Sequence, residues 1–388
     1  MTSPSLSSSP PIIRAGFIPL IDSAPLIIAK EKGFAADQGV KLKLSREVSW
    51  ANIRDRINIG QFDVAHMLAG MPIAANLGIG QIKSKMIAPM ALGRGGNAIT
   101  VSRSFYDRLI AMGGAPKDPL SLGHALKRVL DQRKIEGEDL LTFAMVFPFS
   151  NHNYQLRYWF AASGIDPEND LRLIVIPPPY MVRSLEAGQV DGFCVGEPWN
   201  SIATDQKVGK ILLQSSQIWP AGPEKVLGMQ QAWAEANSDL LAALLRAVDT
   251  AAAWADDPAN KAELAQILSR KNHLEVDPNH ILSALQNGMR FSRQNGVKAK
   301  KQDALWLFAQ MVRWGQTEHS KEAWHLVEKT YRPDLLENAT GEKSETKSTD
   351  LEPAFTTPLG GSPFDLNDIE GYIRSCTIRS GKILCNAP

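Results

Sequence analysis

Short apolar runs alternate with helix-like segments from residue 12 onward, and this alternation restricts the fold more than any other feature of the chain. Strands are predicted at Ile12–Phe17 and at residues 40–44 and 64–67, and helices at residues 25–32, from about residue 51, and over residues 71–77. A regular strand–helix alternation favours a mostly parallel sheet with helices on both faces. The first part of the chain is therefore predicted to be a doubly wound α/β lobe.

A second run of the same alternation follows a glycine-rich segment. The segment GRGGNAITVS, residues 93–102, contains three glycines, which suit a backbone that crosses from one lobe into another. Further strands are predicted at residues 141–146, 173–176 and 191–195, and residues 211–213 are interpreted as the strand that returns to the first lobe. These patterns predict two similar α/β lobes.

The predicted organisation has four parts: a disordered leader (1–11), a discontinuous first lobe (12–95 and 200–337), a second lobe (96–199), and a flexible linker with a C-terminal tail (338–388). The helices from residue 230 to about residue 330 are expected to pack on the first lobe. The segment TGEKSETKSTDLEPAF is polar and has few core-forming residues, which favours a linker. Beyond it, Ile369, Tyr372 and Ile373 can form a short amphipathic turn, either as a loosely docked tail or as a partner contact.

Charge and cysteine content restrict the partners. The net charge is +1, so no bulk field attracts nucleic acid or an anionic membrane. Cys194, Cys376 and Cys385 are too few and too scattered for a disulfide framework or a zinc site. The N-terminal sequence MTSPSLSSSPPIIRAGF has neither the basic nor the apolar region of an export signal, so we expect a cytoplasmic location without membrane attachment.

Loops at the predicted strand ends carry a set of hydrogen-bond donors, and ligands of α/β sheets bind at such ends. The candidates are Trp50, Asn97, His152, Gly196 and Lys225. They offer an indole N–H, an amide, an imidazole, a backbone N–H and an ammonium group. Each also has an ordinary structural explanation: Trp50 can fill the core, His152 can cap a helix, and Lys225 can be a solvated charge. Together they predict a site for a small anion.

The chemistry of this donor set favours anions that only accept hydrogen bonds. Nitrate and nitrite have no proton to donate, so their site needs converging donors and about one positive charge. Bicarbonate also needs an acceptor, usually a carboxylate. The only carboxylates near the candidates in sequence are Glu197 and Glu224, which neighbour candidate positions. Lys225 therefore favours nitrate or nitrite.

Several segments resemble the nitrate-binding proteins of nitrate/bicarbonate ABC importers, a group within the taurine/sulfonate-type substrate-binding proteins. They are GFIPLIDSAPLIIAKEKGF, SWANIRDRINIGQFDVAHMLAGMP, GNAIT, LRYWFAASGI, VGEPWN and PEKVLG, and the resemblance covers residues 12–330. It implies a bilobed periplasmic-binding-protein-like fold of type II, with the ligand cleft between the lobes. By resemblance, the family's anion ligands match Trp50, Asn97 (glutamine in some importers), His152, Gly196 and Lys225.

The resemblance leaves the role of the protein open between three functions. The apparent lack of an export signal resembles a cytoplasmic branch of the family, which implies a nitrate/nitrite sensor that releases an RNA-binding antitermination regulator; the tail after Asn338 is not typical of that branch. The alternative is the periplasmic substrate-binding component of a nitrate ABC transporter. An enzyme on the same fold, such as a thiamine-pyrimidine synthase, is disfavoured because no nucleophile–base pair is evident. We expect no catalytic residues, no cofactor, no metal and no direct nucleic-acid binding.

Overall fold

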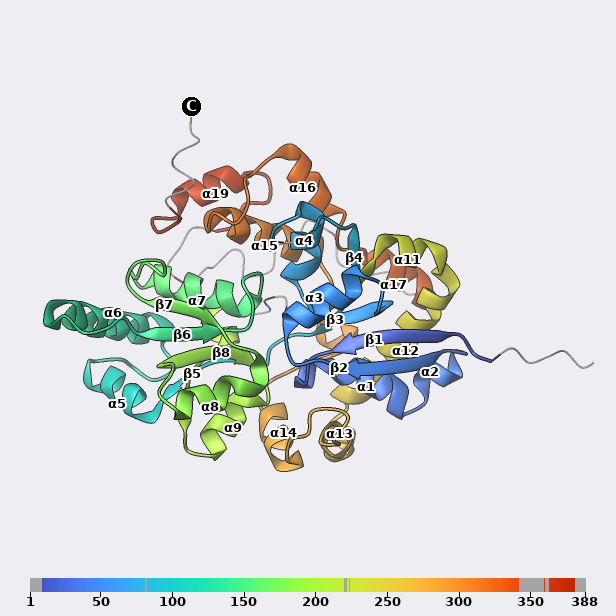
Figure 1. Ribbon diagram of the computed structural model, residues 1–388, viewed down its shortest axis with the longest axis horizontal. Coiled ribbons are helices and arrows are strands. Elements are labelled where there is room, and N and C mark those ends of the chain that lie inside the picture. The colour runs from blue at the N-terminus through green and yellow to red at the C-terminus, as the bar shows by residue number, and fades with distance from the viewer. Residues whose placement is uncertain are drawn as a thin grey trace, which may run out of the picture.

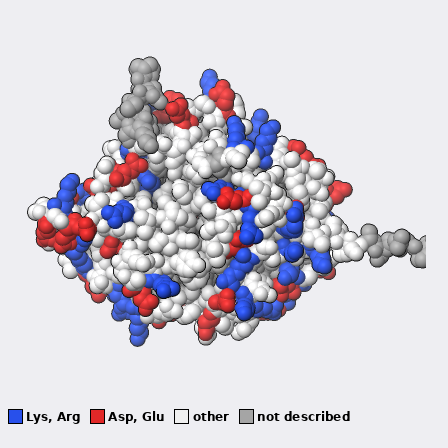
Figure 2. Space-filling view, viewed as in Figure 1, with Lys and Arg blue, Asp and Glu red and all other residues white. Residues whose placement is uncertain are grey.

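Two five-stranded sheets, one in each half of the molecule, organise the structure (Figure 1). The computed structural model describes residues 9–80, 82–219, 222, 224–341, 359 and 363–380. Each sheet is flanked by helices, as the α/β prediction requires. Figure 2 shows basic and acidic side chains interspersed over the viewed face, in keeping with the net charge of +1.

The first sheet has the order β2-β1-β3-β10-β4. Its strands are β1 (Ile12–Phe17), β2 (Lys41–Arg46), β3 (Val64–Leu68), β4 (Met86–Gly93) and β10 (Lys225–Gln230). Strands β1, β2 and β3 are parallel, whereas β10 runs antiparallel between β3 and β4. The connecting elements are η1 (Ile21–Ser23), α1 (Ala24–Glu31), α2 (Phe34–Asp37), α3 (Trp50–Asn58) and α4 (Gly70–Leu77). The predicted alternation of the first lobe is confirmed.

The second sheet has the order β7-β6-β8-β5-β9. Its strands are β5 (Asn97–Ser102), β6 (Thr142–Met145), β7 (Arg172–Val175), β8 (Gly192–Gly196) and β9 (Gly209–Gln214). The helices around it are α5 (Arg103–Ala111), α6 (Pro119–Glu136), α7 (Asn151–Ala162), η2 (Pro178–Tyr180), α8 (Met181–Glu186), α9 (Trp199–Asp205) and α10 (Ser215–Ile218). Each sheet has one antiparallel strand inserted among parallel ones, and this shared order makes the two lobes alike.

The interpretation of residues 211–213 as the returning strand is wrong. These residues belong to β9, which pairs antiparallel with β5 in the second sheet, and β10 is the strand that returns. The sequence pattern identified a strand correctly, but a buried strand carries no local signal of its partner. The predicted boundary of the second lobe at residue 199 therefore falls short of β9.

The crossing from the first sheet to the second takes place in the predicted glycine-rich segment. Gly95 and Gly96 have φ angles of +77° and +83°, a backbone conformation that other residues rarely adopt. A Cβ atom at Gly96 would also collide with the Met289 side chain. Glycine is thus required where β4 passes into β5.

The helices after β10 cover both lobes. They are α11 (Gln231–Ala236), α12 (Ser238–Asp256), η3 (Pro258–Asn260), α13 (Lys261–Leu268), α14 (Pro278–Leu285), η4 (Arg293–Asn295), α15 (Lys301–Arg313), α16 (Lys321–Glu328), α17 (Pro333–Thr340) and α19 (Ile369–Ser375). Helix α12 packs on α1 in the first lobe, as predicted, whereas α14 packs on α9 in the second. Within the described residues, no helix is both long and apolar enough to cross a bilayer.

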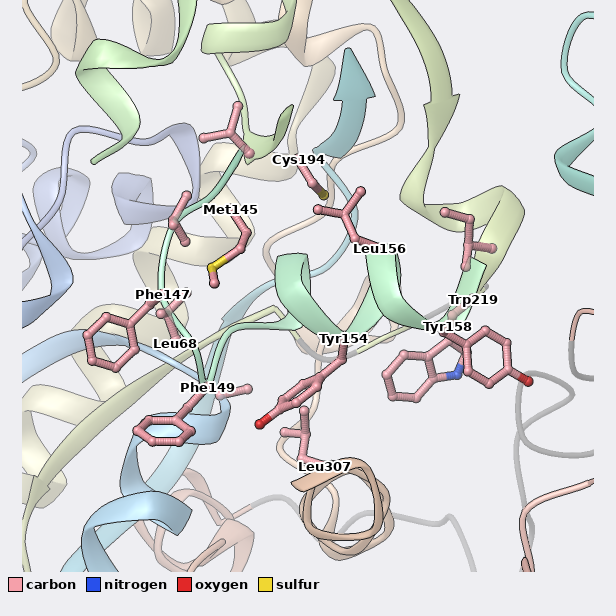
Figure 3. Close-up of a cluster of buried hydrophobic side chains, with 14 of the residues drawn as sticks. Leu68, Met145, Phe147, Phe149, Tyr154, Leu156, Tyr158, Cys194, Trp219 and Leu307 are labelled. Atoms are coloured by element: carbon pink, nitrogen blue, oxygen red, sulfur yellow. The ribbon is translucent and has the colours of Figure 1, made fainter. Parts of the chain in front are cut away.

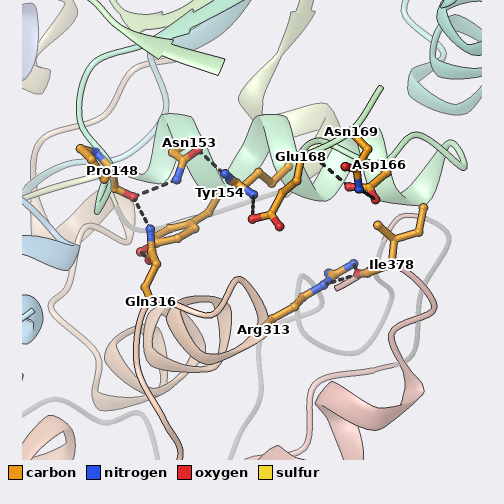
Figure 4. Close-up of polar contacts among 10 residues, drawn as sticks. Pro148, Asn153, Tyr154, Asp166, Glu168, Asn169, Arg313, Gln316 and Ile378 are labelled. Atoms are coloured by element: carbon orange, nitrogen blue, oxygen red, sulfur yellow. Dashed lines mark hydrogen bonds and ion pairs between the residues drawn. The ribbon is translucent and has the colours of Figure 1, made fainter. Parts of the chain in front are cut away.

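Helix α15 lies between the lobes, which corrects the expectation that these helices pack on the first lobe alone. It contacts α4 of the first lobe, and its Trp306 ring packs on the ring of Trp219, beside the second lobe, with 3.6 Å between the ring centroids. Figure 3 shows Leu307 of α15 facing the Tyr154 ring of α7. Just after α15, Gln316 accepts a hydrogen bond of 2.7 Å from the Tyr154 hydroxyl (Figure 4).

The described part of the predicted tail is docked against α15. Helix α19 buries Ile369, Tyr372 and Ile373, the residues of the predicted amphipathic turn. Arg313 donates two hydrogen bonds, of 3.1 and 2.9 Å, to the Ile378 carbonyl (Figure 4). The linker was predicted to begin at residue 338, but α17 continues to Thr340. The rest of the predicted linker lies mostly outside the described residues, as does the leader before residue 9.

Candidate functional site

The five predicted site residues lie together where the two sheets meet. Each stands at the end of an element: Trp50 opens α3, Asn97 opens β5, His152 lies in the first turn of α7, Gly196 ends β8, and Lys225 opens β10. All four side chains of this set are buried. The strand ends of both sheets face one another across the junction, so residues far apart in sequence become neighbours.

Lys225 is the centre of a buried ionic network. Its Nζ lies 2.7 Å from Oδ2 of Asp22 and 3.5 Å from Oε2 of Glu224, and it donates a hydrogen bond of 3.3 Å to Oδ1 of Asn97. The other oxygen of Asp22 lies 2.9 Å from Nε2 of His66. Of the two carboxylates that neighbour the predicted candidates in sequence, Glu224 contacts the lysine directly, and Asp22 is a further carboxylate in contact with it.

His66 fixes the orientation of this network. Its Nδ1 accepts a hydrogen bond of 3.4 Å from the backbone N–H of Ile18, so Nε2 carries the proton, on the side that faces Asp22. The Trp50 ring packs against the imidazole, with 5.2 Å between ring centroids. Asp22 and His66 are functional candidates that the sequence analysis missed; Asp22 lies in the loop after the first predicted strand, and His66 lies within the third.

Amide groups hold Glu224 from two sides. Nδ2 of Asn97 donates a hydrogen bond to Oε2 of Glu224, and Nδ2 of Asn151 donates one of 3.4 Å to Oε1. Gly196 pairs with Asn97 in the β-ladder, and a Cβ atom on it would lie 3.3 Å from Oδ1 of Asn97 and 3.5 Å from the Leu20 side chain. A side chain at position 196 would therefore crowd the Asn97 amide at the edge of the network.

Several buried polar atoms at this junction lack partners, and the indole, the neutral imidazole and the amide among them each have an N–H to donate. Within the described residues, no hydrogen-bond partner is found for Nε1 of Trp50, for either ring nitrogen of His152, or for Nε2 of Gln155. The alternative in which His152 caps α7 is wrong, because Ser150 is the cap. An unsatisfied buried polar group costs about 1–3 kcal/mol. A bound ligand that accepts hydrogen bonds would satisfy these donors.

Burial and charge act against each other on the ionisable groups. Burial opposes the charge of Asp22, but Lys225 and His66 hold its pKa below the usual range. Burial likewise opposes the charge of Lys225, yet Asp22 and Glu224 keep its pKa above the ordinary value. Burial lowers the pKa of His66 and, together with Lys225, holds that of His152 well below its usual value. Both histidines are therefore neutral at pH 7.

Glu224 is the exception, because its side chain is partly protonated and partly ionised near neutral pH. Burial raises the pKa of Glu224 from 4.5 to about 7, against the opposing effect of Lys225. The site therefore has a net charge near zero when Glu224 is protonated and near −1 when it is ionised. The predicted free positive charge of Lys225 is already compensated by Asp22. Among the described residues, no cluster of His, Cys, Asp or Glu could hold a metal ion.

This architecture defines a class of protein. Two α/β lobes, joined by crossing segments and enclosing a buried polar site at their junction, are the periplasmic-binding-protein-like fold of type II, as the sequence predicted. The chain belongs to the NMT1-like family, which it matches over residues 7–269.

The relatives of the chain are named for small oxyanions. It is 35% identical over 388 residues to the nitrate/nitrite binding protein NrtA of Synechococcus elongatus, covering 93% of this chain and 85% of that protein. It is 32% identical over 377 residues to the bicarbonate transport ATP-binding protein CmpC of the same species, covering 94% and 55%. The chain thus spans about half the length of the ATP-binding relatives that it matches.

A solved structure gives a similar result. The crystal structure of the periplasmic nitrate-binding protein NrtA from Synechocystis superposes with a TM-score of 0.82 at 30% identity, covering 95% of this chain and 98% of that chain. This likeness confirms the predicted fold. The ligand-binding roles of Trp50, Asn97, His152, Gly196 and Lys225 remain predictions, which the geometry of the junction makes testable.

Proposed function

We propose that the protein is a nitrate- and nitrite-binding receptor, acting as the substrate-binding component of an importer. The observation that carries this proposal is the set of unpaired buried donors, on Trp50 and His152, beside the Lys225 network. The relatives named for nitrate support it, since they match nearly the whole chain. This role was the alternative in the sequence analysis, and the comparisons favour it over the sensor.

The size of the ligand limits its affinity. Nitrate has four heavy atoms, and a ceiling of about 1.5 kcal/mol per atom gives a binding free energy of about 6 kcal/mol, or a Kd of tens of micromolar. A caged anion that satisfies several otherwise unpaired donors can exceed this value somewhat. We therefore expect micromolar binding.

The test is isothermal titration of the full chain with nitrate, nitrite, bicarbonate and sulfate. Trp50→Phe removes the unpaired indole N–H and keeps an aromatic ring, so nitrate affinity should fall about tenfold, the equivalent of one hydrogen bond to a charged group. Trp233→Phe, on α11 outside the junction, is the matched control and should bind as the wild type does. Equal nitrate affinity in the Trp50 variant and the wild type would contradict the site assignment.

The sensor remains a second prediction, which rests on the resemblance, and its location in the cytoplasm is predicted from the N-terminal sequence. That role requires a complex with an RNA-binding antitermination regulator that nitrate or nitrite dissociates. Titrating nitrate into the chain mixed with such a regulator distinguishes the two roles. Ligand-dependent release would favour the sensor, whereas nitrate binding without any regulator complex would favour the importer component. The relatives are named as binding and transport proteins, which disfavours the enzyme alternative.

A further inference from the structure

The charge balance of the junction is unfavourable for an anion as long as Glu224 is ionised. The charged groups in contact with one another in the Lys225 network are Lys225, Asp22 and Glu224, and their side chains are at most 1% exposed. With both carboxylates ionised the cluster has a charge of −1, and a bound nitrate would bring it to −2. Uncompensated charge is costly in a buried site.

The other titratable groups that interact with Lys225 cannot easily relieve this imbalance of charge. His152 of α7 and His66 of β3 have pKa values lowered by burial, so both are neutral. The buried Cys194 thiol of β8 has a pKa raised well above its usual value and stays protonated. Asp22 is held ionised by Lys225 and His66. Glu224 is the group whose protonation costs least.

The surroundings of Glu224 can also receive its proton in a hydrogen bond. Within the described residues, Oδ1 of Asn151 is buried without a partner, while Nδ2 of the same side chain lies 3.4 Å from Oε1 of Glu224. Rotating the Asn151 amide group by half a turn exchanges its oxygen and nitrogen, and this places Oδ1 as an acceptor next to Oε1 of Glu224. Asn97 continues to donate to Oε2 in either arrangement. The junction therefore accommodates a protonated Glu224 without loss of hydrogen bonds.

We propose that Glu224 is a specificity-determining residue of the anion site and that it binds the ligand in its protonated form, so that nitrate enters the protein together with one proton from solvent. This inference rests on the proposed function. Protonated Glu224 leaves the occupied site with a charge near −1, and there it can donate its proton to an anion that only accepts hydrogen bonds, in place of Asn151. Ionised Glu224 adds a second negative charge and repels it.

The direction of the pH effect follows from this linkage. A bound anion raises the pKa of Glu224 above the value of about 7 that it has in the unoccupied site. Nitrate affinity is therefore highest below pH 7 and falls as the pH rises above 7. For a coupling of one proton, the Kd increases about tenfold for each pH unit in this range.

The experiment counts protons by isothermal titration with nitrate at pH 8 in imidazole and in Tris. These buffers differ in ionisation enthalpy and do not compete as anions. The wild type should take up close to one proton per nitrate. Glu224→Gln should take up none, and its Kd should stay constant between pH 6 and pH 8.5. Glu224→Asp retains an acid and should retain the proton uptake.

Glu197→Gln is the matched control. Glu197 is also a buried glutamate with a pKa raised by burial to about 7, but its side chain contacts Ser201 and Asn287 rather than Lys225. Proton uptake should persist in this variant. Nitrate binding to the wild type without proton uptake at pH 8, or undiminished uptake in Glu224→Gln, would overturn the proposal. An absence of nitrate binding at every pH would contradict the proposed function instead.

Discussion

Asp22 determines how Lys225 acts on an anion. The two groups form an ion pair of 2.7 Å, so the lysine contributes a hydrogen-bond donor and a local dipole rather than a free charge. A buried lysine without its counter-ion is costly, and breaking such a pair on one side destabilises a protein by about 3–5 kcal/mol. A bound anion next to the lysine can take over part of the missing charge.

Asp22→Asn should therefore destabilise the unliganded protein by about 3 kcal/mol and make its stability depend more strongly on nitrate. The measurement is urea unfolding with and without saturating nitrate. The exposed Asp37→Asn is the control and should behave as the wild type does. Equal stabilisation by nitrate in the Asp22 variant and the wild type would argue against an anion next to Lys225.

At the level of residues, the sequence predicted donors well and their partners poorly. Trp50, His152 and Lys225 were found because donors at strand ends point to a ligand, and the structure brings them to one junction. Asp22 lies in η1, just after β1, and His66 lies within β3, so neither stands at a strand end as the predicted donors do. The contacts of Asp22 with Lys225 and with His66 depend on how β1, β3 and β10 align in the sheet, and no local pattern encodes that alignment.

Helix α15 shows how one element serves both lobes and the tail. Arg313 at its end lies over the rings of Tyr158 and Trp314 and donates to the Ile378 carbonyl. The neighbouring Trp306 ring packs on Trp219. The docking of residues 363–380 therefore depends on the same helix that joins the lobes.

Arg313→Ala should release this C-terminal segment. It removes the two hydrogen bonds to the Ile378 carbonyl and the contact with Tyr158, so cleavage within residues 363–380 by a protease should become faster. Limited proteolysis followed by mass spectrometry measures the rate. Arg374→Ala, an exposed change on α19, provides the comparison, and equal rates in the two variants would show that Arg313 does not hold the segment.

The helices and strands themselves were largely predictable, because hydrophobic periodicity and turn-forming residues are local features of a sequence. The strand–helix alternation of the first lobe, the glycine crossing and the amphipathic turn at Ile369 all follow from such local patterns. The partner of β9 and the position of α15 between the lobes were not predictable. Both depend on contacts between elements far apart in the chain, and such contacts produce no recognisable local pattern in the sequence.

On the scale of the whole molecule, a buried carboxyl group at the junction makes stability depend on pH. Glu197 follows β8, and its backbone carbonyl accepts a hydrogen bond of 2.9 Å from the N–H of Ile21 in the first lobe. Burial raises the pKa of its side chain from 4.5 to about 7. The protonated form is therefore favoured in the folded protein, and this contribution is present below pH 4.5 and lost as the pH rises through 7.

Between pH 5 and pH 8, the wild type should lose about 3 kcal/mol of unfolding free energy relative to Glu197→Gln, which cannot ionise. Urea unfolding at intermediate pH values gives both curves, and their difference isolates Glu197 from other titrating groups. The exposed Glu186→Gln should run parallel to the wild type. Parallel curves for Glu197→Gln and the wild type would mean that the carboxyl group ionises without cost.

The position of β10 also affects the order in which the chain folds during synthesis. Strand β10 lies between β3 and β4, so the first sheet has a gap until residue 230 has left the ribosome. The strands of the second sheet are all contained in residues 97–214, an uninterrupted stretch that emerges earlier. The second lobe is therefore able to complete its sheet first, although it begins later in the sequence. The N-terminal strands of the first sheet can complete theirs only after β10 has been synthesised, more than half-way along the chain.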